Sequence, residues 1–248
     1  MSNNDNTDIE DLIRPDIHSS SAEYRQRFAG KVGEWFLQTQ NQITHDLLKE
    51  GPNTQTVIDF GGGHGQNIKT CQKLGLQVSI LSSDETCNQL IKQEFNSLEY
   101  KIGLLTDSQC DPQSYDAVLS YRMLPHLQDW KTHIAELCKV SKGTVVIEFP
   151  NSKSVNAFSD KLFALKKSVE GNTRQFTLFS LEQVSAEFES HGFKLITAKG
   201  QYLLPMVVHR ALKLPSISKV FEKVIGVILP RTKFGSPLIC KFQRSFDN

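Results

Sequence analysis

A glycine-rich loop that follows a short apolar run is the feature that most constrains this chain. The run Thr56–Phe60 is rich in β-branched residues, four glycines fill the loop Gly61–Gly65, and a helical pattern begins at Gln66. Glycines at the end of a strand permit positive φ angles and let a ligand lie against bare backbone. The start of a following helix offers free N–H groups to an anion. The segment therefore predicts a strand, a ligand-binding loop and a helix in succession.

Two common ligands of such loops do not fit this one. A dinucleotide fingerprint needs Gly-x-Gly-x-x-Gly, and its third glycine would fall on Gln66 or Ile68, depending on where the count starts. A P-loop needs Gly-Lys followed by Ser or Thr, which the loop lacks. The loop is therefore predicted to bind a different ligand.

Apolar runs of strand length alternate with helical patterns along the chain. Strands are predicted at 56–60, 77–81, 99–105, 115–120, 144–149, 194–198 and 238–242. Helices are predicted at 21–50 (interrupted near Gly30 and Gly33), 66–74, 84–96, 128–140, 156–168, 181–190 and within 206–229. This alternation is typical of an α/β fold with a mainly parallel sheet. Ligands of such sheets bind beyond the carboxyl ends of the strands.

Composition excludes several classes of protein. Lys and Arg number 28 and Asp and Glu number 27, a formal net charge of +1, which argues against a highly basic nucleic-acid wrapper. The five cysteines include no Cys-x-x-Cys pair, which favours free thiols in the cytoplasm and predicts no metal site. The first residues are polar and acidic, and no apolar stretch reaches about 18 residues, so neither a secretory signal nor a transmembrane helix is predicted.

The spacing Asp59-x-Gly61-x-Gly63-x-Gly65 resembles the nucleotide-binding motif of class I S-adenosylmethionine-dependent methyltransferases. Four further segments are similar to successive parts of that family: its fourth strand, the loop after it, its fifth strand, and the helix with a Gly-Phe entry into its sixth strand (114–120, 122–127, 143–150 and 180–195). The resemblance covers about residues 55–198. It implies a Rossmann-like, seven-stranded, mostly parallel sheet with helices on both faces, an antiparallel last strand, and S-adenosyl-L-methionine as cofactor.

The resemblance also suggests how the chain is organised. Residues 1–20 are predicted to be a flexible leader, and residues 21–248 a single methyltransferase domain. Within that domain we expect an N-terminal helical cap (21–52), a cofactor-binding core (53–150) and an acceptor-side half with a C-terminal helical insertion (151–248).

Several cofactor contacts are carried over from the family pattern. They comprise the loop with its preceding acid, the end of the second strand, and the loop after the third strand (Asp59, Gly61, Gly62, Gly63, His64, Gly65, Ser82, Ser83, Asp84 and Asp107). The family usually has a ribose-binding acid where this sequence has Ser82. Asp84 is the predicted substitute, and its alternative role is to cap the helix that follows.

Other candidates lie near the expected position of the transferred methyl group. Tyr121 and Arg122 follow the fourth strand, and Arg122 is predicted to contact the methionine carboxylate. His126 is the candidate general base, because a histidine suits proton transfer at neutral pH; its alternative is packing on the loop. Tyr24 and Arg27 belong to the helical cap, where the Tyr24 ring would face the sulfonium or the acceptor, or would pack beside Phe28.

The acceptor half carries a distinctive charge pattern. Asn151 is predicted either to contact the acceptor or to cap a helix. Between residues 199 and 244 there is one acid, Glu222, and nine basic residues (Lys199, Arg210, Lys213, Lys219, Lys223, Arg231, Lys233, Lys241 and Arg244). An anionic or apolar acceptor, peripheral contact with a membrane, or a solvated helical subdomain would each fit this pattern.

The sequence favours transfer of a methyl group to an oxygen or nitrogen of a small molecule. No nucleic-acid partner is expected, because no nucleic-acid module is evident. Two alternatives stay open: a catalytically inactive binding or regulatory subunit, and a methyltransferase of a macromolecule. The sequence does not fix the oligomeric state.

Overall fold

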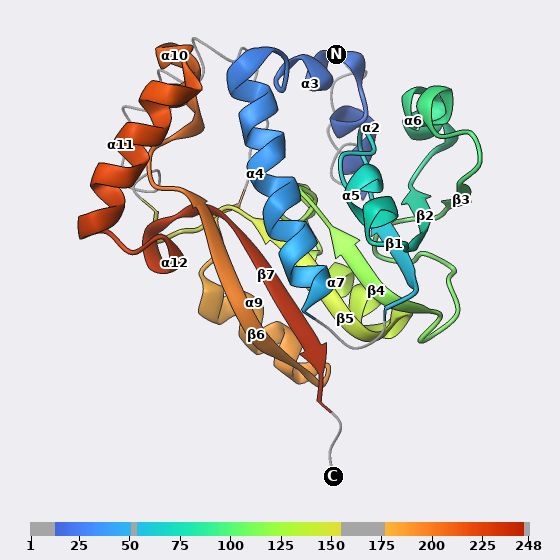
Figure 1. Ribbon diagram of the computed structural model, residues 1–248. Helices are drawn as coiled ribbons and strands as arrows, with labels where there is room; N and C mark the ends of the chain where they lie inside the picture. Colours follow the sequence, from blue (N-terminus) through green and yellow to red (C-terminus); the bar gives the residue numbers. More distant parts are fainter. Residues whose placement is uncertain (1–12, 51–53, 155–176, 246–248) are drawn as a thin grey trace, which may run out of the picture.

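A single seven-stranded sheet organises the molecule, a computed structural model that describes residues 13–50, 54–154 and 177–245 (Figure 1). The strand order is β3-β2-β1-β4-β5-β7-β6. The first five strands are parallel, whereas β7 runs antiparallel to both β5 and β6. The strands are β1 (Thr56–Phe60), β2 (Gln77–Ser82), β3 (Glu99–Ile102), β4 (Tyr115–Ser120), β5 (Ser141–Phe149), β6 (Phe193–Tyr202) and β7 (Ser236–Arg244). The predicted fold class is therefore confirmed, including the antiparallel last strand.

Helices cover both faces of the sheet. One face carries α4 (Gly30–Lys49), α5 (Ile68–Lys73) and α6 (Gln89–Glu94), and the other carries α7 (Trp130–Val140) and α9 (Leu181–Ser190). The remaining helices are α2 (Pro15–Ser19), α3 (Ala22–Gln26), α10 (Met206–Leu212), α11 (Pro215–Ile228) and α12 (Arg231–Phe234), with short 3-10 turns η1 (Glu85–Asn88) and η2 (Leu124–His126). In Figure 1, α10 and α11 lie at the outer edge beyond α4.

Alternation along the central strand separates two apolar cores. In β1, Ile58 and Phe60 pack toward α7 and α9, whereas Val57 packs toward α4 and α5. Because successive side chains of a strand point to opposite faces, Asp59 lies on the same face as Val57. This places its carboxylate under α4 and beside the start of α5.

The structure differs from the sequence predictions in three places. Residues 13–20 were predicted to belong to a loose leader, but they contain α2, whose Asp16 is only 1% exposed. The cap helix is interrupted at residues 27–29 and not at Gly33, which lies inside α4. The predicted helix 84–96 is divided into η1 and α6. The predicted helix 156–168 and residues 1–12 lie outside the described residues.

Candidate active site

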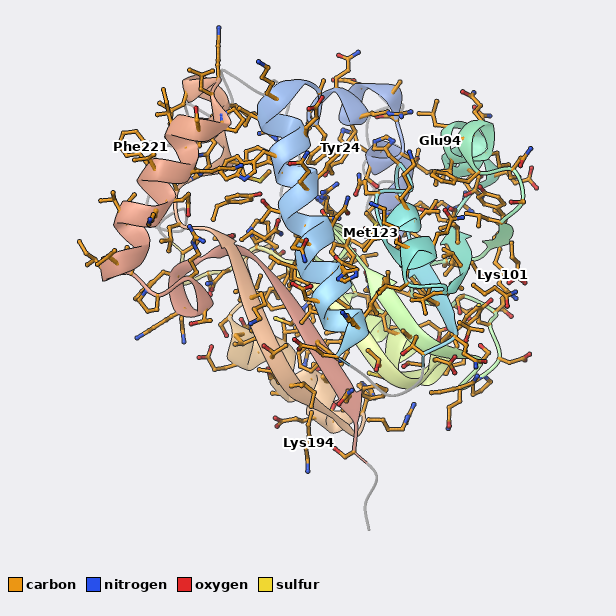
Figure 2. The ribbon with its side chains drawn as sticks, in the orientation of Figure 1. Tyr24, Glu94, Lys101, Met123, Lys194 and Phe221 are labelled. Atoms are coloured by element: carbon orange, nitrogen blue, oxygen red, sulfur yellow. The ribbon has the colours of Figure 1, made fainter. Side chains whose placement is uncertain are left out.

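The glycine loop joins β1 to α5 and presses against the end of β4. Gly61 has a φ of +70°, and a Cβ there would lie 2.5 Å from the sulfur of Met123, which follows β4 and is labelled in Figure 2. A side chain at this position would therefore be strained twice, by its backbone angle and by a clash. The structure explains why glycine stands here, and it leaves the loop backbone bare toward the carboxyl ends of the strands.

Asp59 lies directly below this loop and is held by a chain of amides. It is 3% exposed, and the Asn67 side-chain NH₂ donates to its carboxylate at 3.0 Å. Gln40 of α4 donates in turn to the Asn67 carbonyl oxygen at 3.1 Å. Burial raises the pKa of Asp59 to about 6, although the Asn67 hydrogen bond and the Arg122 charge act in the opposite direction. The acid is therefore ionised at neutral pH but near its titration range.

Arg122 is the cation that faces this acid. It adopts a positive φ of 65° directly after β4, and its guanidinium donates to Gln66 at 2.7 Å and to Gln40. Its Nε lies 3.6 Å from a carboxylate oxygen of Glu148, and its guanidinium carbon lies 4.1 Å from the centroid of the Phe28 ring. These contacts fix the positive charge at the end of β4. A strained, anchored arginine in this position favours binding of an anionic group.

Glu148 lies deeper than the glycine loop. Its side chain is buried in β5, its other carboxylate oxygen accepts a hydrogen bond from Gln201, and burial raises its pKa. Its contact with Arg122 links β5 to the end of β4. Its burial and its contacts with Arg122 and Gln201 make it part of the packing at the end of β5.

A very small cavity, of about 10 Å³, opens above the glycine loop. Its lining comes from the N-terminal segments, β1, the loop and the end of β4 (Ser19, Tyr24, Asp59, Gly61, Gly62, Gly63, Gln66, Asn67, Tyr121, Arg122 and Met123). This volume lies far below the range of about 300–1,000 Å³ that is usual for small-molecule pockets. The cavity is narrow because α2 and α3 lie over the loop.

The cap contributes aromatic rings to this cover. Tyr24 stacks on His64 of the glycine loop with ring centroids 6.0 Å apart, and its ring also contacts His18 edge-on at 5.5 Å. The Arg27 guanidinium lies over the Tyr24 ring, with its carbon 4.9 Å from the ring centroid. Burial, together with the charges of Arg25 and Arg122, lowers the pKa of His64 to about 4, so this imidazole is neutral at physiological pH. The structure thus brings Tyr24, Arg27 and His64 together, as residues of one cover.

The end of β2 is arranged differently from the prediction. The Ser82 hydroxyl donates to Asn88 at 2.7 Å, and Asp84 caps η1 by accepting from the Thr86 N–H at 2.9 Å. Asp84 is also exposed to solvent and lies 3.8 Å from Arg14. The capping role of Asp84 is therefore present, and its contact with a ribose stays a prediction.

Asp16 of α2 is the carboxylate that is buried at this strand end. It accepts hydrogen bonds from the Ser83 N–H, at 2.7 Å, and from the Ser83 hydroxyl. Its Cβ lies 3.4 Å from the position that a Cβ on Gly61 would take. Asp16 is therefore placed between β2 and the glycine loop, in the region where the family usually has its ribose-binding acid.

Two predicted residues, Tyr121 and Asn151, are held by hydrogen bonds within the protein. The Tyr121 hydroxyl hydrogen-bonds the Thr44 hydroxyl at 2.6 Å, and burial raises its pKa, so it is not available as a base. The Asn151 NH₂ donates to the carbonyl oxygens of Lys233 and Gly235, while its own carbonyl oxygen accepts from the Lys153 N–H. The amide of Asn151 therefore holds the end of β5, and its contact with an acceptor stays a prediction.

Two others lie outside the small cavity. Asp107 is exposed in a turn, where its backbone N–H donates to the Leu104 carbonyl oxygen at 3.0 Å. His126 is the last residue of η2, which follows Met123. Its side chain is half-buried and does not line the cavity. Their roles toward adenine and as a base, respectively, stay predictions.

Sequence reasoning missed Asp16, Gln40 and Asn67. Asn67 follows the glycine loop closely, and its position at the start of the next helix could have marked it. Gln40 is a buried polar residue in an amphipathic helix, and Asp16 precedes any periodic pattern. Only the folded arrangement brings them to the loop.

Comparisons with known proteins agree with this arrangement. A family model described as a methyltransferase domain matches residues 23–198. A Mycobacterium tuberculosis protein named a probable S-adenosylmethionine-dependent methyltransferase is 22% identical over 119 residues, which cover 47% of this chain and 43% of the relative. The matched region therefore spans less than half of that relative.

Solved structures share the fold at low sequence identity. Magnesium protoporphyrin IX methyltransferase from Synechocystis, solved with bound S-adenosylhomocysteine, has a TM-score of 0.60 and 15% identity, and the match covers 90% of this chain and 93% of that one. A complex of the Haloferax volcanii Trm112 methyltransferase activator with a methyltransferase gives a TM-score of 0.58, 16% identity and coverage of 87% and 96%. Geranyl diphosphate C-methyltransferase from Streptomyces coelicolor has a TM-score of 0.58 and 13% identity, and the match covers 83% of this chain and 78% of that one.

The family match extends over most of the chain and includes the cap, the glycine loop and the strands around it. The structure gives that region the sheet order and bare loop backbone that its sequence predicts. The chain therefore belongs to the methyltransferase-domain family.

Proposed function

We propose that this chain binds S-adenosyl-L-methionine and transfers its methyl group to an oxygen or nitrogen of a small-molecule acceptor. The observation that carries the proposal is the pairing of a buried acid, Asp59, with an anchored cation, Arg122, on either side of the bare glycine loop. The name of the Mycobacterium tuberculosis relative and the ligand bound to the Synechocystis enzyme support the same cofactor.

The residues around the loop fit such a cofactor. Gly61, Gly62 and Gly63 line the cavity, so their backbone would lie against the cofactor. The Arg122 guanidinium would pair with the carboxylate of the methionyl group, and the Asp59 carboxylate supplies the opposite charge beside it. The Tyr24 ring lines the same cavity, but His64 stacks on it and Arg27 lies over it. A contact between this ring and the sulfonium, of about 0.5–2 kcal/mol, would therefore require these two side chains to move.

The bound cofactor would supply an electrophilic methyl group. The protein's contribution is then mainly to position donor and acceptor, which can lower a barrier by about 7–11 kcal/mol when the alignment is good. The cover formed by α2 and α3 also excludes water from the loop. His126 stays the proposed base for an acceptor that must lose a proton, because the Tyr121 hydroxyl is committed to Thr44.

Asp16 is our proposed replacement for the missing ribose-binding acid. Ser82 is occupied with Asn88, and Asp84 caps η1 at the surface. The Asp16 carboxylate is buried, and it accepts hydrogen bonds from Ser83 and from the Cys87 thiol. Burying a carboxylate is costly, and two ribose hydroxyls would add further hydrogen bonds to it.

Calorimetric titration with S-adenosylmethionine and S-adenosylhomocysteine tests the proposed function. We expect micromolar binding that weakens at least roughly tenfold in Asp59→Ala and in Arg122→Gln. The control is Asp111→Ala, which removes an exposed acid away from the loop. If the wild-type chain binds neither ligand at about 1 mM, the proposal is wrong.

A catalytically inactive binding or regulatory subunit is the second candidate. It is favoured by Ser82 at the usual acid position and by the narrow cavity under α2. A chain of this kind would bind the cofactor weakly and transfer no methyl group from radiolabelled S-adenosylmethionine to any acceptor. A single acceptor that becomes labelled by the wild-type chain, but not by Asp59→Ala, would exclude it.

A further inference from the structure

The outer face of α11 is apolar. Six of its residues follow one helical stripe, and their exposed fractions include 84% for Val227, 79% for Ile228, 62% for Val220 and 60% for Val224; Ile217 and Phe221 complete the stripe. Phe221 lies at the periphery of the molecule in Figure 2. A contiguous apolar face of this kind marks an interaction surface, since single exposed apolar residues are common but stripes are not.

The inner face of the same helix is polar, which fixes how the helix is turned. Ser218 and Glu222 are its buried residues. The Glu222 carboxylate accepts hydrogen bonds from the N–H groups of Leu203 and Leu204 at 2.9–3.0 Å and contacts the His209 ring nitrogen at 3.0 Å. If α11 rotated so that its apolar stripe faced the protein, these contacts would break and the Glu222 carboxylate would be exposed. The apolar stripe is therefore held outward by the fold.

Basic residues surround this stripe. Lys213, Lys219, Lys223, Arg231 and Lys233 are exposed on α11 or next to it. The one acid in this part of the sequence, Glu222, is buried and lies 3.3 Å from Arg231. The surface that faces outward thus combines apolar and positive side chains, without an exposed acid between residues 199 and 244.

Two of the basic residues counted in the sequence belong elsewhere. Lys241 is buried and donates to the carbonyl oxygens of Leu47 and Glu50. Arg244 donates to the carbonyl oxygens of Cys138 and Ser141. Both hold the sheet to its helices, so the positive charge available to a partner is concentrated around α11.

We infer that α11 docks on an anionic membrane surface. The stripe would enter the boundary between headgroups and acyl chains, and the lysines would reach anionic headgroups, as in interfacial amphipathic helices. The 14-residue helix is about 21 Å long, which suits a helix lying in the plane of the membrane. None of the helices in the described segments has the length and apolar character needed to span a bilayer. Charge complementarity selects an anionic surface as the occupant.

Sedimentation of the full chain with lipid vesicles tests this inference. We expect binding to vesicles of phosphatidylcholine mixed with phosphatidylglycerol, and little binding to phosphatidylcholine alone. Replacing both Val227 and Ile228 by serine should weaken binding on the order of a hundredfold. Replacing both Lys219 and Lys223 by glutamine should weaken it roughly thirtyfold and reduce its sensitivity to salt.

Matched control residues lie near the start of β6, at the end of that strand away from α11. Ile196 is 53% exposed in β6, and Lys194 lies on the same strand at the bottom of Figure 2. The Ile196→Ser and Lys194→Gln variants should bind vesicles like the wild type. Equal binding to both kinds of vesicle, binding to neither, or equal losses in the control variants would overturn the inference.

Two other occupants of the stripe give different results. A second copy of the chain would give a dimer in light scattering that the Val227→Ser and Ile228→Ser changes dissociate. A covering segment of the chain itself would make these changes lower the melting temperature of the free protein. Either result, together with a lack of vesicle binding, refutes the membrane surface. Titration with S-adenosylhomocysteine in parallel keeps this outcome separate from the proposed function, because all these variants should bind it normally.

Discussion

At the residue scale, two carboxylates compete for the same role at the end of β2. Asp16 is buried against Ser83, whereas Asp84 caps η1 at the surface. We expect Asp16→Asn to weaken S-adenosylhomocysteine binding roughly tenfold to hundredfold, because hydrogen bonds to charged groups contribute about 1.5–3 kcal/mol. Asp84→Asn, the matched control, should leave the affinity nearly unchanged. Calorimetry with both variants measures the difference.

A ligand without the ribose hydroxyls makes this prediction specific. The Asp16→Asn change should have little effect on the affinity for a 2′,3′-dideoxy analogue of S-adenosylhomocysteine, because the contact is already missing. If instead α2 merely covers the groove, Asp16→Asn would loosen it and raise the affinity for both ligands. A loss confined to Asp84→Asn would restore the original prediction for that residue.

Asp59 should leave a signature in the pH dependence of stability. Its pKa is raised from 3.8 to about 6 by burial, a difference that corresponds to about 3 kcal/mol. Between these values the folded chain holds a proton that the unfolded chain has released. Raising the pH through this window therefore lowers the free energy of unfolding, and the cost is complete above about pH 6.

The Asp59→Asn variant lacks this titration. Its stability relative to wild type should increase by about 3 kcal/mol from below pH 4 to above pH 6. Urea denaturation at several pH values measures this difference, in which the titrations of His64 and His133 cancel because both proteins share them. A constant difference across the window would show that Asp59 titrates normally in the folded chain.

At the scale of elements, the strand–loop–helix unit depends on glycine for two separable reasons. Gly61 and Gly75 both have positive φ, of 70° and 76°, but only a Cβ on Gly61 would meet a neighbour. We expect Gly75→Ala to lose about 1 kcal/mol of stability from backbone strain alone. Gly61→Ala should lose about 2–4 kcal/mol, because overpacking is added to strain, and it should also lose cofactor binding.

Thermal or urea denaturation of the two alanine variants gives the comparison. The Met123→Ala background should recover part of the Gly61→Ala loss, since it removes the sulfur that the new Cβ would meet. No recovery in that background would mean that the clash is not what excludes a side chain at Gly61.

The elements that the sequence predicted correctly are those whose information is local. The unit from β1 to α5 is encoded in one continuous stretch, Thr56–Lys73, and β4 and β5 are marked by their apolar runs. In contrast, α2 has five residues, no side-chain cap at Arg14, and an anchor to Ser83 that is 67 residues away. A helix of this length is not stable by itself, so no local pattern could reveal it.

The same difference between local and long-range contacts explains which site residues the sequence predicted and which it did not. Asp59 and the glycines were predicted from one motif, because their geometry follows from that motif. The contacts of the Asn151 amide could not be predicted, because its partners, the backbone at Lys233 and Gly235, lie more than 80 residues away. Gln40 was missed since its contact with Asn67 joins α4 to the loop across 27 residues.

At the scale of the whole molecule, the alkylation rates of the cysteine thiols measure whether the cover formed by α2 and α3 opens independently of the sheet. All five cysteines are buried, and Cys87 of η1 lies beneath α2, where burial and Asp16 raise its pKa to about 11. Cys71 and Cys240 lie in the core of the sheet. We expect Cys87 to be alkylated faster than these two, because local opening needs less free energy than global unfolding.

Mass spectrometry of alkylated peptides measures these rates. S-adenosylhomocysteine should slow the alkylation of Cys87 by stabilising the closed cover, while Cys71 and Cys240 should react only through global opening. Equal rates at all three thiols would show that the cover and the sheet open as one unit.

The position of β7 has a consequence for how the chain is made. Although β7 comes after β6 in sequence, it lies between β5 and β6 in the sheet (Figure 1). During synthesis, the first five strands can assemble side by side as they emerge, but β6 has no neighbour to pair with until residues 236–244 leave the ribosome. Until β7 emerges, the nascent chain therefore carries an unpaired β6 and an open edge on β5. Chaperones that shield unpaired strand edges would have their longest opportunity to act on this protein at that stage.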